Sequence, residues 1–352
     1  MHYTFPITRN ENPKQKPDPN DIGFAKYFTD HMFIMDYDEE HGWHDGRIVP
    51  YGPISLDPGA TTLHYAQEAF EGMKAYRNPE GKVNLFRPDM NAKRLRKTCE
   101  RMCIPEIDED LFISSVEELV KLDQDWIPDL FGTSLYIRPF IISPEVNLAP
   151  VAASHYTYMV ILTPVTPYHS NVSHILVEDE YIRAVVGGTG FAKCGGNYAG
   201  ALRANVKAAQ YKCHDVLWLD AKEHKYIEEV GTSNAFFVID GKVVTSPLTG
   251  SILPGVTRDS VIQLLEKWGV EVDQRRLPVD EAIEAAKSGR MTEAWASGTA
   301  CVIAPMGLLN YKGEDYPING EQVGPLSKKL YDVLYGMQTG TRPDDMGWVV
   351  TL

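Results

Sequence analysis

A lysine between two glycine-rich turns, Lys193, is the feature that most constrains this chain. Five glycines stand within the ten positions that surround it: Gly187, Gly188, Gly190, Gly195 and Gly196. Backbone without Cβ turns with positive φ and lets a flat ligand lie directly against it, at an entropic cost during folding. By itself the motif also fits an ordinary lysine in a surface loop. A lysine that burial or a neighbouring cation deprotonates would instead serve Schiff-base chemistry.

Length and charge narrow the class of protein. With 352 residues, 43% of them hydrophobic, the chain can bury two ordinary cores. We expect a smaller N-terminal α/β domain over 1–163, a proline-interrupted linker over 164–177, and a larger C-terminal domain over 178–352 that carries the lysine. The net charge of -14 argues against a nucleic-acid partner, because lysine and arginine must neutralise phosphates.

Apolar runs and cysteines indicate the cellular compartment in which the protein is expected. Runs such as 158–162 fall well short of the roughly 20 residues of a membrane helix, and the first six residues lack the basic and apolar regions of a signal peptide. The five cysteines include no Cys-x-x-Cys pair, which suits reduced thiols better than disulfides or a zinc site. We therefore expect a cytoplasmic protein with no membrane contact and no metal site.

Periodicity predicts a mixed α/β and α+β fold. One helix begins at Pro88, and a second runs from about Leu111 with Asp108 as its cap. Strand-like runs lie at 134–138, 155–162, 216–219 and 235–239, and Asp240 with Gly241 indicates a hairpin. After the lysine, Leu202 and Val206 mark the apolar face of a further helix. The first helix carries a basic run that we interpret as its solvated face: Lys93, Arg94, Arg96, Lys97 and Arg101.

Four further segments offer groups that would suit a phosphorylated, ring-bearing cofactor. A carboxylate before a glycine turn, at Glu228 or Glu229, could hold a ring nitrogen protonated, as acids do for pyridoxal 5'-phosphate (PLP). A solvated turn acid is the ordinary interpretation, and it is the one we favour for Glu228. Arg87 precedes a helix start, where a guanidinium and free amides suit a phosphate, although a solvated arginine is again the ordinary interpretation.

The other two segments are turns with exposed amides. A Pro-Gly turn leads into a helix at Val256 and Thr257, whose amides would be unpaired donors at the positive end of the helix dipole. A small-residue turn at 296–301 offers hydroxyls and amides to an oxyanion, including the Thr299 hydroxyl. Each of these signals is weak when it is taken alone.

Taken in order, the motifs resemble those of branched-chain amino acid aminotransferases, of the fold-type IV group of PLP enzymes. The resemblance runs nearly end to end. It rests on these segments: Phe28–Met32, Leu63–Lys74, Leu85–Pro88, Gly132–Pro139, Lys193–Tyr198, Glu229–Asn234, Leu253–Arg258 and Ser297–Cys301. It implies the two-domain fold-type IV architecture. It also favours Lys193 over Lys74 or Lys207 as the Schiff-base lysine and proton shuttle, and Glu229 over Glu228 at the pyridine nitrogen.

The resemblance implies a role for each matching residue. Around PLP, Tyr198 would bind the phenolic oxygen and Arg183 would lie close by. The phosphate would be held by four residues: Arg87, Val256, Thr257 and Thr299. Thr232 and the Ala300 amide would receive the substrate carboxylate, and Arg138 could pair with the second carboxylate of glutamate, although a structural ion pair is its other interpretation. The side-chain pocket would be walled by four aromatic residues: Phe24, Phe70, Tyr136 and Tyr168. Tyr65 would reach the neighbouring site of a homodimer.

The implied activity is transfer of the amino group of L-leucine, L-isoleucine or L-valine to 2-oxoglutarate, giving the 2-oxo acid and L-glutamate by a ping-pong mechanism. A D-amino acid aminotransferase or an aminodeoxychorismate lyase would share the same lysine, glutamate and phosphate residues. A cofactor-free lyase or a non-catalytic binding protein would not need them. The sequence departs from the animal members of this family at Ala304, where those members carry a second cysteine three residues after the first. Because Cys301 therefore lacks this partner, we expect no intramolecular thiol switch.

Overall fold

The structure is a computed structural model that describes residues 1–166 and 172–352. The predicted linker therefore lies partly outside the described residues, and Tyr168 lies wholly outside them. Two compact units are present. Unit 1 contains the described residues of Met1–Tyr168 together with Ala192–Gly195 and Gly336–Leu352, and unit 2 contains those of His169–Phe191 and Gly196–Tyr335.

The two units differ from the contiguous domains that the sequence predicts. The Lys193 segment and the C-terminal tail belong to unit 1, although both follow position 178. Backbone pairing explains both placements. The Phe70 amide donates to the Lys193 carbonyl over 3.0 Å, and the last strand, β18, pairs antiparallel with β5 at Val349 and Phe86.

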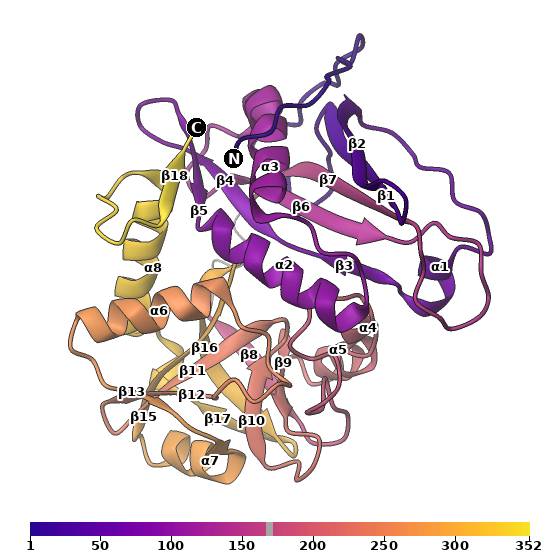
Figure 1. The fold of residues 1–352 in the computed structure, drawn as a ribbon. Helices are drawn as coiled ribbons and strands as arrows, with labels where there is room; N and C mark the ends of the chain where they lie inside the picture. Colours follow the sequence, from indigo (N-terminus) through magenta and orange to yellow (C-terminus); the bar gives the residue numbers. More distant parts are fainter. Residues whose placement is uncertain (167–171) are drawn as a thin grey trace. The chain divides into compact units, whose positions relative to one another are not determined.

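An eight-stranded sheet forms the centre of unit 1, in the order β18-β5-β4-β6-β7-β1-β2 with β3 paired to β6. Helices α2 and α3 lie over one face of it (Figure 1). Its elements are β1 (His31–Asp38), β2 (Gly42–Pro50), α1 (Thr61–Tyr65), β3 (Glu68–Phe70), β4 (Met73–Arg77), β5 (Val83–Phe86), α2 (Pro88–Met102), α3 (Glu109–Asp123), η1 (Gln124–Trp126), β6 (Ser134–Ile142), β7 (Tyr156–Val165) and β18 (Val349–Thr351).

The two helices begin as the sequence predicts. Pro88 occupies the first turn of α2, where its missing amide hydrogen would have no partner, and Asp108 caps α3 by accepting from the Leu111 amide over 3.1 Å. Each helix buries one apolar stripe against the sheet, with Leu95 and Val116 almost fully buried.

Unit 2 is built on a ten-stranded sheet in the order β13-β12-β11-β15-β16-β8-β9-β10-β14, with β17 on β16. A further pairing of β10 with β11 closes the ring β8-β9-β10-β11-β15-β16, so Glu229 lies opposite Asn234. The elements are β8 (Ser173–Glu178), α4 (Gly196–Ala199), α5 (Leu202–Gln210), β9 (Asp215–Leu219), β10 (Tyr226–Val230), β11 (Ser233–Ile239), β12 (Lys242–Thr245), α6 (Val256–Lys267), β13 (Val272–Gln274), β14 (Leu277–Pro278), α7 (Val279–Lys287), β15 (Met291–Gly298), β16 (Val302–Tyr311), β17 (Glu314–Pro317) and η2 (Asn319–Glu321). Helix α8 (Pro325–Thr339) begins in unit 2 and ends in unit 1.

One predicted turn is confirmed and one predicted helix face is wrong. Asp240 and Gly241 both have positive φ, at 51° and 78°, between the antiparallel strands β11 and β12. On α5, however, the structure buries Ala204 and Ala208 and leaves Leu202 64% and Val206 54% exposed. Small alanines face the core because they let the helix approach β8 and β9 closely.

Among the residues that the structure describes, no helix combines the length and the apolar character that crossing a membrane would require.

Candidate active site

Lys193 is anchored in unit 1 by its backbone. Its amide donates to the Thr98 hydroxyl of α2 over 3.0 Å, and its carbonyl accepts from the Phe70 amide over 3.0 Å. The amine lies 4.9 Å from the centroid of the Phe70 ring. Gly195 lies close to Glu68: a Cβ at position 195 would lie 1.8 Å from the Glu68 carboxylate, so the Glu68 side chain would have to move. The lysine is therefore held on a fixed backbone.

The surroundings of this amine favour its neutral form. Burial, with help from the Arg94 guanidinium, lowers the pKa of Lys193 to about 8, against the opposing attraction of Glu71. An amine with this pKa is a nucleophile and a base in a useful fraction of molecules at neutral pH, unlike a solvated lysine. The pKa of this lysine is therefore well below that of a solvated lysine, and its role as the reactive lysine stays a prediction.

The arginine beside this lysine corrects our interpretation of the basic run on α2. Lys93, Arg96 and Lys97 are exposed, but Arg94 is buried. Its Nε and Nη2 donate to the two carboxylate oxygens of Glu71 over 2.7 and 2.8 Å. Burial works against the charge of Glu71, yet Arg94 and Lys193 outweigh it and hold the pKa of the Glu71 carboxyl below its usual range.

Sequence reasoning missed this buried pair, although a signal was available. Asn91, Arg94 and Thr98 follow one another at helical spacing on the buried face of α2, and each makes a polar contact there. The Asn91 amide donates to Glu71 over 2.8 Å. A polar stripe on the buried face of a helix indicates a site rather than a solvated surface.

Aromatic residues and one arginine that the sequence singles out lie together in unit 1. The rings of Phe24 and Tyr136 meet edge to face at 5.5 Å. The Arg138 guanidinium lies 4.7 Å from the centroid of Phe70 and 5.4 Å from that of Tyr136. Among the described residues, the buried Arg138 Nε has no hydrogen-bond partner, so it is a donor still available to an anion.

Two more predicted residues lie elsewhere on unit 1. Arg87 is the cap residue of α2, with a φ of 49°, and its guanidinium lies 4.9 Å from the centroid of Trp348. Tyr65 ends α1, is 41% exposed, and donates its hydroxyl to the Leu148 carbonyl. Arg87 is buried, which differs from the solvated arginine that is the ordinary interpretation of this position.

In unit 2, Glu229 and Arg183 form a buried ion pair. Arg183 Nε lies 3.2 Å from Glu229 Oε2, and both side chains are more than nine-tenths buried. The other carboxylate oxygen of Glu229 accepts from the Leu253 amide over 2.7 Å. A cation and an amide donor both favour a charged carboxylate. Glu229 is therefore arranged as a fixed buried anion.

The neighbouring acid, Glu228, corrects a second interpretation, since it is not a solvated turn residue. It lies in β10, is 8% exposed, and accepts from the Ser251 hydroxyl. Burial raises the pKa of its carboxyl, against the hydrogen bond from Ser251 and the charge of Arg183. Glu228 lines a cavity of about 630 Å³ in unit 2.

Close backbone contacts explain two glycines near this ion pair. Arg183 Nη2 donates to the carbonyls of Gly190 and Ser251. A Cβ at position 190 would lie 2.2 Å from the Ser251 carbonyl oxygen, and a Cβ at Gly255 would lie 2.1 Å from Asn234 Oδ1. The Gly190 loop therefore approaches neighbouring backbone more closely than a side chain would permit, whereas a side chain at position 255 would require Asn234 to move.

The residues predicted to bind anions in unit 2 lie at turns and at one helix start. Val256 and Thr257 are the first two residues of helix α6, which follows Gly255, a residue with no side chain to cap the first amides. Thr232 is exposed in the β10–β11 turn, after Gly231 with a φ of 54°. The remaining three lie in the turn between β15 and β16 and in the short helix α4: Thr299, Ala300 and Tyr198.

Comparison with known proteins identifies the family. Residues 68–307 match the model of the family described as amino-transferase class IV. The chain belongs to the class IV aminotransferases.

Relatives of this class IV aminotransferase agree in sequence and in fold. It is 50% identical to branched-chain-amino-acid transaminase 1 of Bacillus subtilis (strain 168), over 96% of either chain. A solved Escherichia coli branched-chain amino acid aminotransferase matches with a TM-score of 0.74 at 25% identity, covering 90% of this chain and 97% of that one. The Thermobaculum terrenum branched-chain amino acid aminotransferase, solved in its PLP form, has the same fold, with a TM-score of 0.74 at 23% identity over 91% of this chain and 97% of that one. The predicted fold-type IV architecture is confirmed.

Proposed function

We propose that this protein catalyses reversible transfer of the amino group of L-leucine, L-isoleucine or L-valine to 2-oxoglutarate, with PLP as cofactor. The observation that carries the proposal is the Lys193 amine, whose pKa is lowered to about 8 beside the buried Arg94–Glu71 pair. The Bacillus subtilis transaminase, which is 50% identical to this chain, supports the substrate class, because the two chains match over nearly their whole lengths.

The donors present fit PLP. An amine that loses its proton near neutral pH suits an aldehyde, and a buried carboxylate paired with a cation suits a pyridinium nitrogen. Helix α6 begins without a side-chain cap, and uncapped amides at a helix start suit a phosphate. When bound, PLP supplies the electron sink that stabilises the substrate α-carbon after its proton leaves.

We assign roles to the chain's residues on this basis. Lys193 holds PLP through its amine and moves the proton at the substrate α-carbon. Glu229 accepts from the ring nitrogen, with Arg183 fixing its carboxylate, and Tyr198 donates to the phenolic oxygen. The phosphate is bound by four residues: Arg87, Val256, Thr257 and Thr299. The order of amino donor and oxo acid acceptor follows a ping-pong scheme.

The substrate residues divide by chemistry. Aromatic side chains receive the branched chains, and one extra methylene changes discrimination by only about 1 to 3 kcal/mol, so three substrates can share the pocket. The aromatic residues are Phe24, Phe70, Tyr136 and Tyr168. Arg138 binds the second carboxylate of glutamate, supported by its unpartnered Nε among the described residues. Thr232 and the Ala300 amide bind the α-carboxylate.

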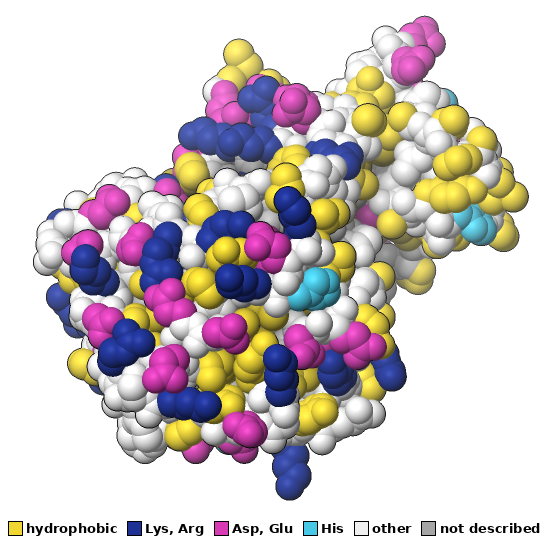
Figure 2. All heavy atoms as spheres, turned by 90° about the horizontal axis from the view of Figure 1, so that it is seen from below, with side chains coloured by type: hydrophobic (Ala, Val, Ile, Leu, Met, Phe, Trp, Pro, Cys, Tyr) yellow, Lys and Arg dark blue, Asp and Glu magenta, His cyan; other side chains and the backbone are white. Residues whose placement is uncertain are grey.

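We further propose a cytoplasmic homodimer in which Tyr65 serves the neighbouring subunit. An exposed apolar patch at the α1 end of unit 1 supports this (Figure 2). Its members are 41 to 65% exposed: Leu63, Tyr65, Val146, Leu148 and Val151. Contiguous exposed apolar surface of this kind marks interfaces more often than free surface.

An amino-donor panel with 2-oxoglutarate as acceptor tests the function. We expect activity with the three branched-chain L-amino acids and none in Lys193→Ala. Lys207→Ala, which removes a lysine paired with Glu178 over 2.8 Å, is the matched control and should keep activity. Activity with D-alanine but not with L-leucine would overturn the proposed substrate class.

A further inference from the structure

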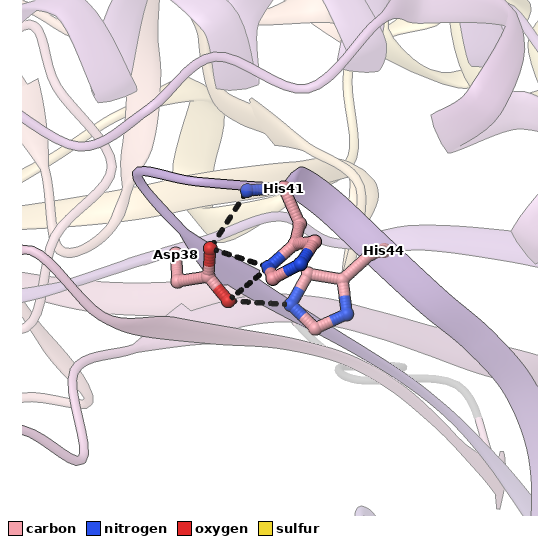
Figure 3. Close-up of side chains that lie close together, drawn as sticks. All are labelled: Asp38, His41 and His44. Atoms are coloured by element: carbon pink, nitrogen blue, oxygen red, sulfur yellow. Dashed lines mark hydrogen bonds and ion pairs between the residues drawn. The ribbon is translucent and has the colours of Figure 1, made fainter.

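A cluster of metal-ligating side chains lies on the β1–β2 hairpin, outside the candidate active site. Asp38, His41 and His44 each offer one ligand atom, and these three atoms lie within 4.8 Å of one another. The three side chains converge on a common point at the tip of the hairpin (Figure 3). None of these residues has a role in the proposed aminotransferase chemistry, and a metal site here departs from the expectation that the sequence gives, which is of none.

The backbone of the hairpin brings these residues to one face. Asp36 lies opposite His44 in the antiparallel register, and Asp38 lies two residues further along the same strand. Residues two apart on a strand share a face, so Asp38 is a diagonal neighbour of His44. His41 joins them from the turn, where its amide and the Glu40 amide both donate to Asp38 Oδ1.

The opposite face anchors this hairpin to the core. Tyr37 and Trp43 lie opposite each other on β1 and β2, with ring centroids 5.2 Å apart, and both pack against the buried core of unit 1. The Trp43 indole donates to the Glu106 carbonyl over 3.0 Å. The three ligand side chains therefore project from a fixed support.

The distances from the Asp38 carboxylate to the two imidazoles match those between ligands of a single ion. His41 Nδ1 lies 3.0 Å from either oxygen of Asp38, and His44 Nε2 lies 3.1 Å from Asp38 Oδ2. Ligands that bind at about 2.0–2.1 Å stand about 2.9 Å apart at neighbouring octahedral positions and about 3.4 Å apart in a tetrahedron. The side chains therefore need to move only slightly for a bound ion to take the place of the hydrogen bonds within the cluster.

A second carboxylate orients one of the imidazoles, as outer ligands do in metal sites. Asp45 Oδ2 lies 2.9 Å from His44 Nδ1, the ring nitrogen that faces away from Asp38. A carboxylate on the outer nitrogen fixes the tautomer that leaves Nε2 free to bind a metal. Asp45 has a φ of 54°, in the left-handed region that aspartate adopts more readily than most residues.

We propose that Asp38, His41 and His44 form a binding site for a first-row divalent transition-metal ion, with Asp45 as the orienting carboxylate of His44. Two imidazoles and a carboxylate suit zinc, nickel or copper, whereas magnesium and calcium prefer oxygen ligands alone. The side chains of His41 and His44 are 58% and 29% exposed, so water completes the coordination.

Calorimetric titration of ZnCl₂ into the tag-free PLP holoenzyme tests this site. We expect one zinc ion per chain, and loss of that binding in His41→Ala and in His44→Ala. His155→Ala is the matched control and should bind as wild type, because His155 is an exposed histidine 3.5 Å from a carboxylate but outside the cluster. Asp45→Asn should weaken the zinc affinity by about 10-fold or more.

Two further measurements keep the assignment open to refutation. The X-ray absorption spectrum of the zinc-loaded wild type should show two imidazole nitrogens and oxygen ligands. A sulfur ligand would contradict the assignment and point to the exposed Cys103 instead. Absence of zinc binding by wild type at about 0.1 mM, an unchanged isotherm in the His41→Ala/His44→Ala double variant, or equal affinity for MgCl₂ would overturn the proposal.

Discussion

The ammonium of Lys193 should destabilise the cofactor-free protein at neutral pH. Its pKa falls from 10.5 to about 8 on folding, and each unit of pKa corresponds to about 1.4 kcal/mol. Between these two values the unfolded chain binds more protons than the folded chain. The penalty is therefore fully present below pH 8, shrinks as the pH rises above 8, and is gone above pH 10.5.

Lys193→Met removes this charge while keeping a flexible side chain of similar length. Evaluating the proton linkage, we expect the variant to gain about 3 kcal/mol in free energy of unfolding at about pH 7 and about 2 kcal/mol at about pH 9. Changes in packing affect both pH values equally, so the difference of about 1 kcal/mol between them reports the charge alone.

Urea unfolding of the cofactor-free wild type and variant at both pH values measures these free energies from midpoint and slope. Lys16→Met, which removes an exposed positive charge, is the control for the change in net charge. A gain that stays constant between the two pH values, or one that grows with pH, would refute the reasoning that burial lowers the pKa of this amine.

Three other changes test the predicted site residues and their neighbours in the two units. Glu71→Gln removes the negative charge that balances the buried Arg94 guanidinium, so we expect a loss of about 3–5 kcal/mol in free energy of unfolding, measured with urea; a loss below about 1 kcal/mol would count against a buried ion pair. Gly190→Ala should weaken PLP binding in fluorescence titrations, because its Cβ would lie 2.2 Å from the Ser251 carbonyl oxygen; Gly196→Ala, with nothing within 4 Å, should bind normally. Glu229→Gln should lower kcat by about 10- to 100-fold, which corresponds to the free energy of one hydrogen bond to a charged group. An unchanged kcat would exclude the proposed role of Glu229.

Local features of this protein could be predicted from sequence because they depend on neighbouring residues. Pro88 at a helix start, Asp108 as a cap and the Asp240–Gly241 turn each depend on the conformations open to a few adjacent residues. Gly190, close to Lys193 in the sequence, likewise marks a position where a Cβ would meet neighbouring backbone. The family was identified for the same reason, since its motifs are short and ordered.

The tertiary structure decided which charges are buried and what they contact. Glu71 and Arg94 stand 23 positions apart, and only the packing of α2 against the sheet brings them together beside Lys193. Glu228 is a second example: the sequence favours a solvated acid in a turn, but the fold places it in strand β10 and buries it. Burial of a charge depends on partners distant in sequence, so the sequence alone predicts which lysine is reactive, while the fold sets the pKa of that lysine.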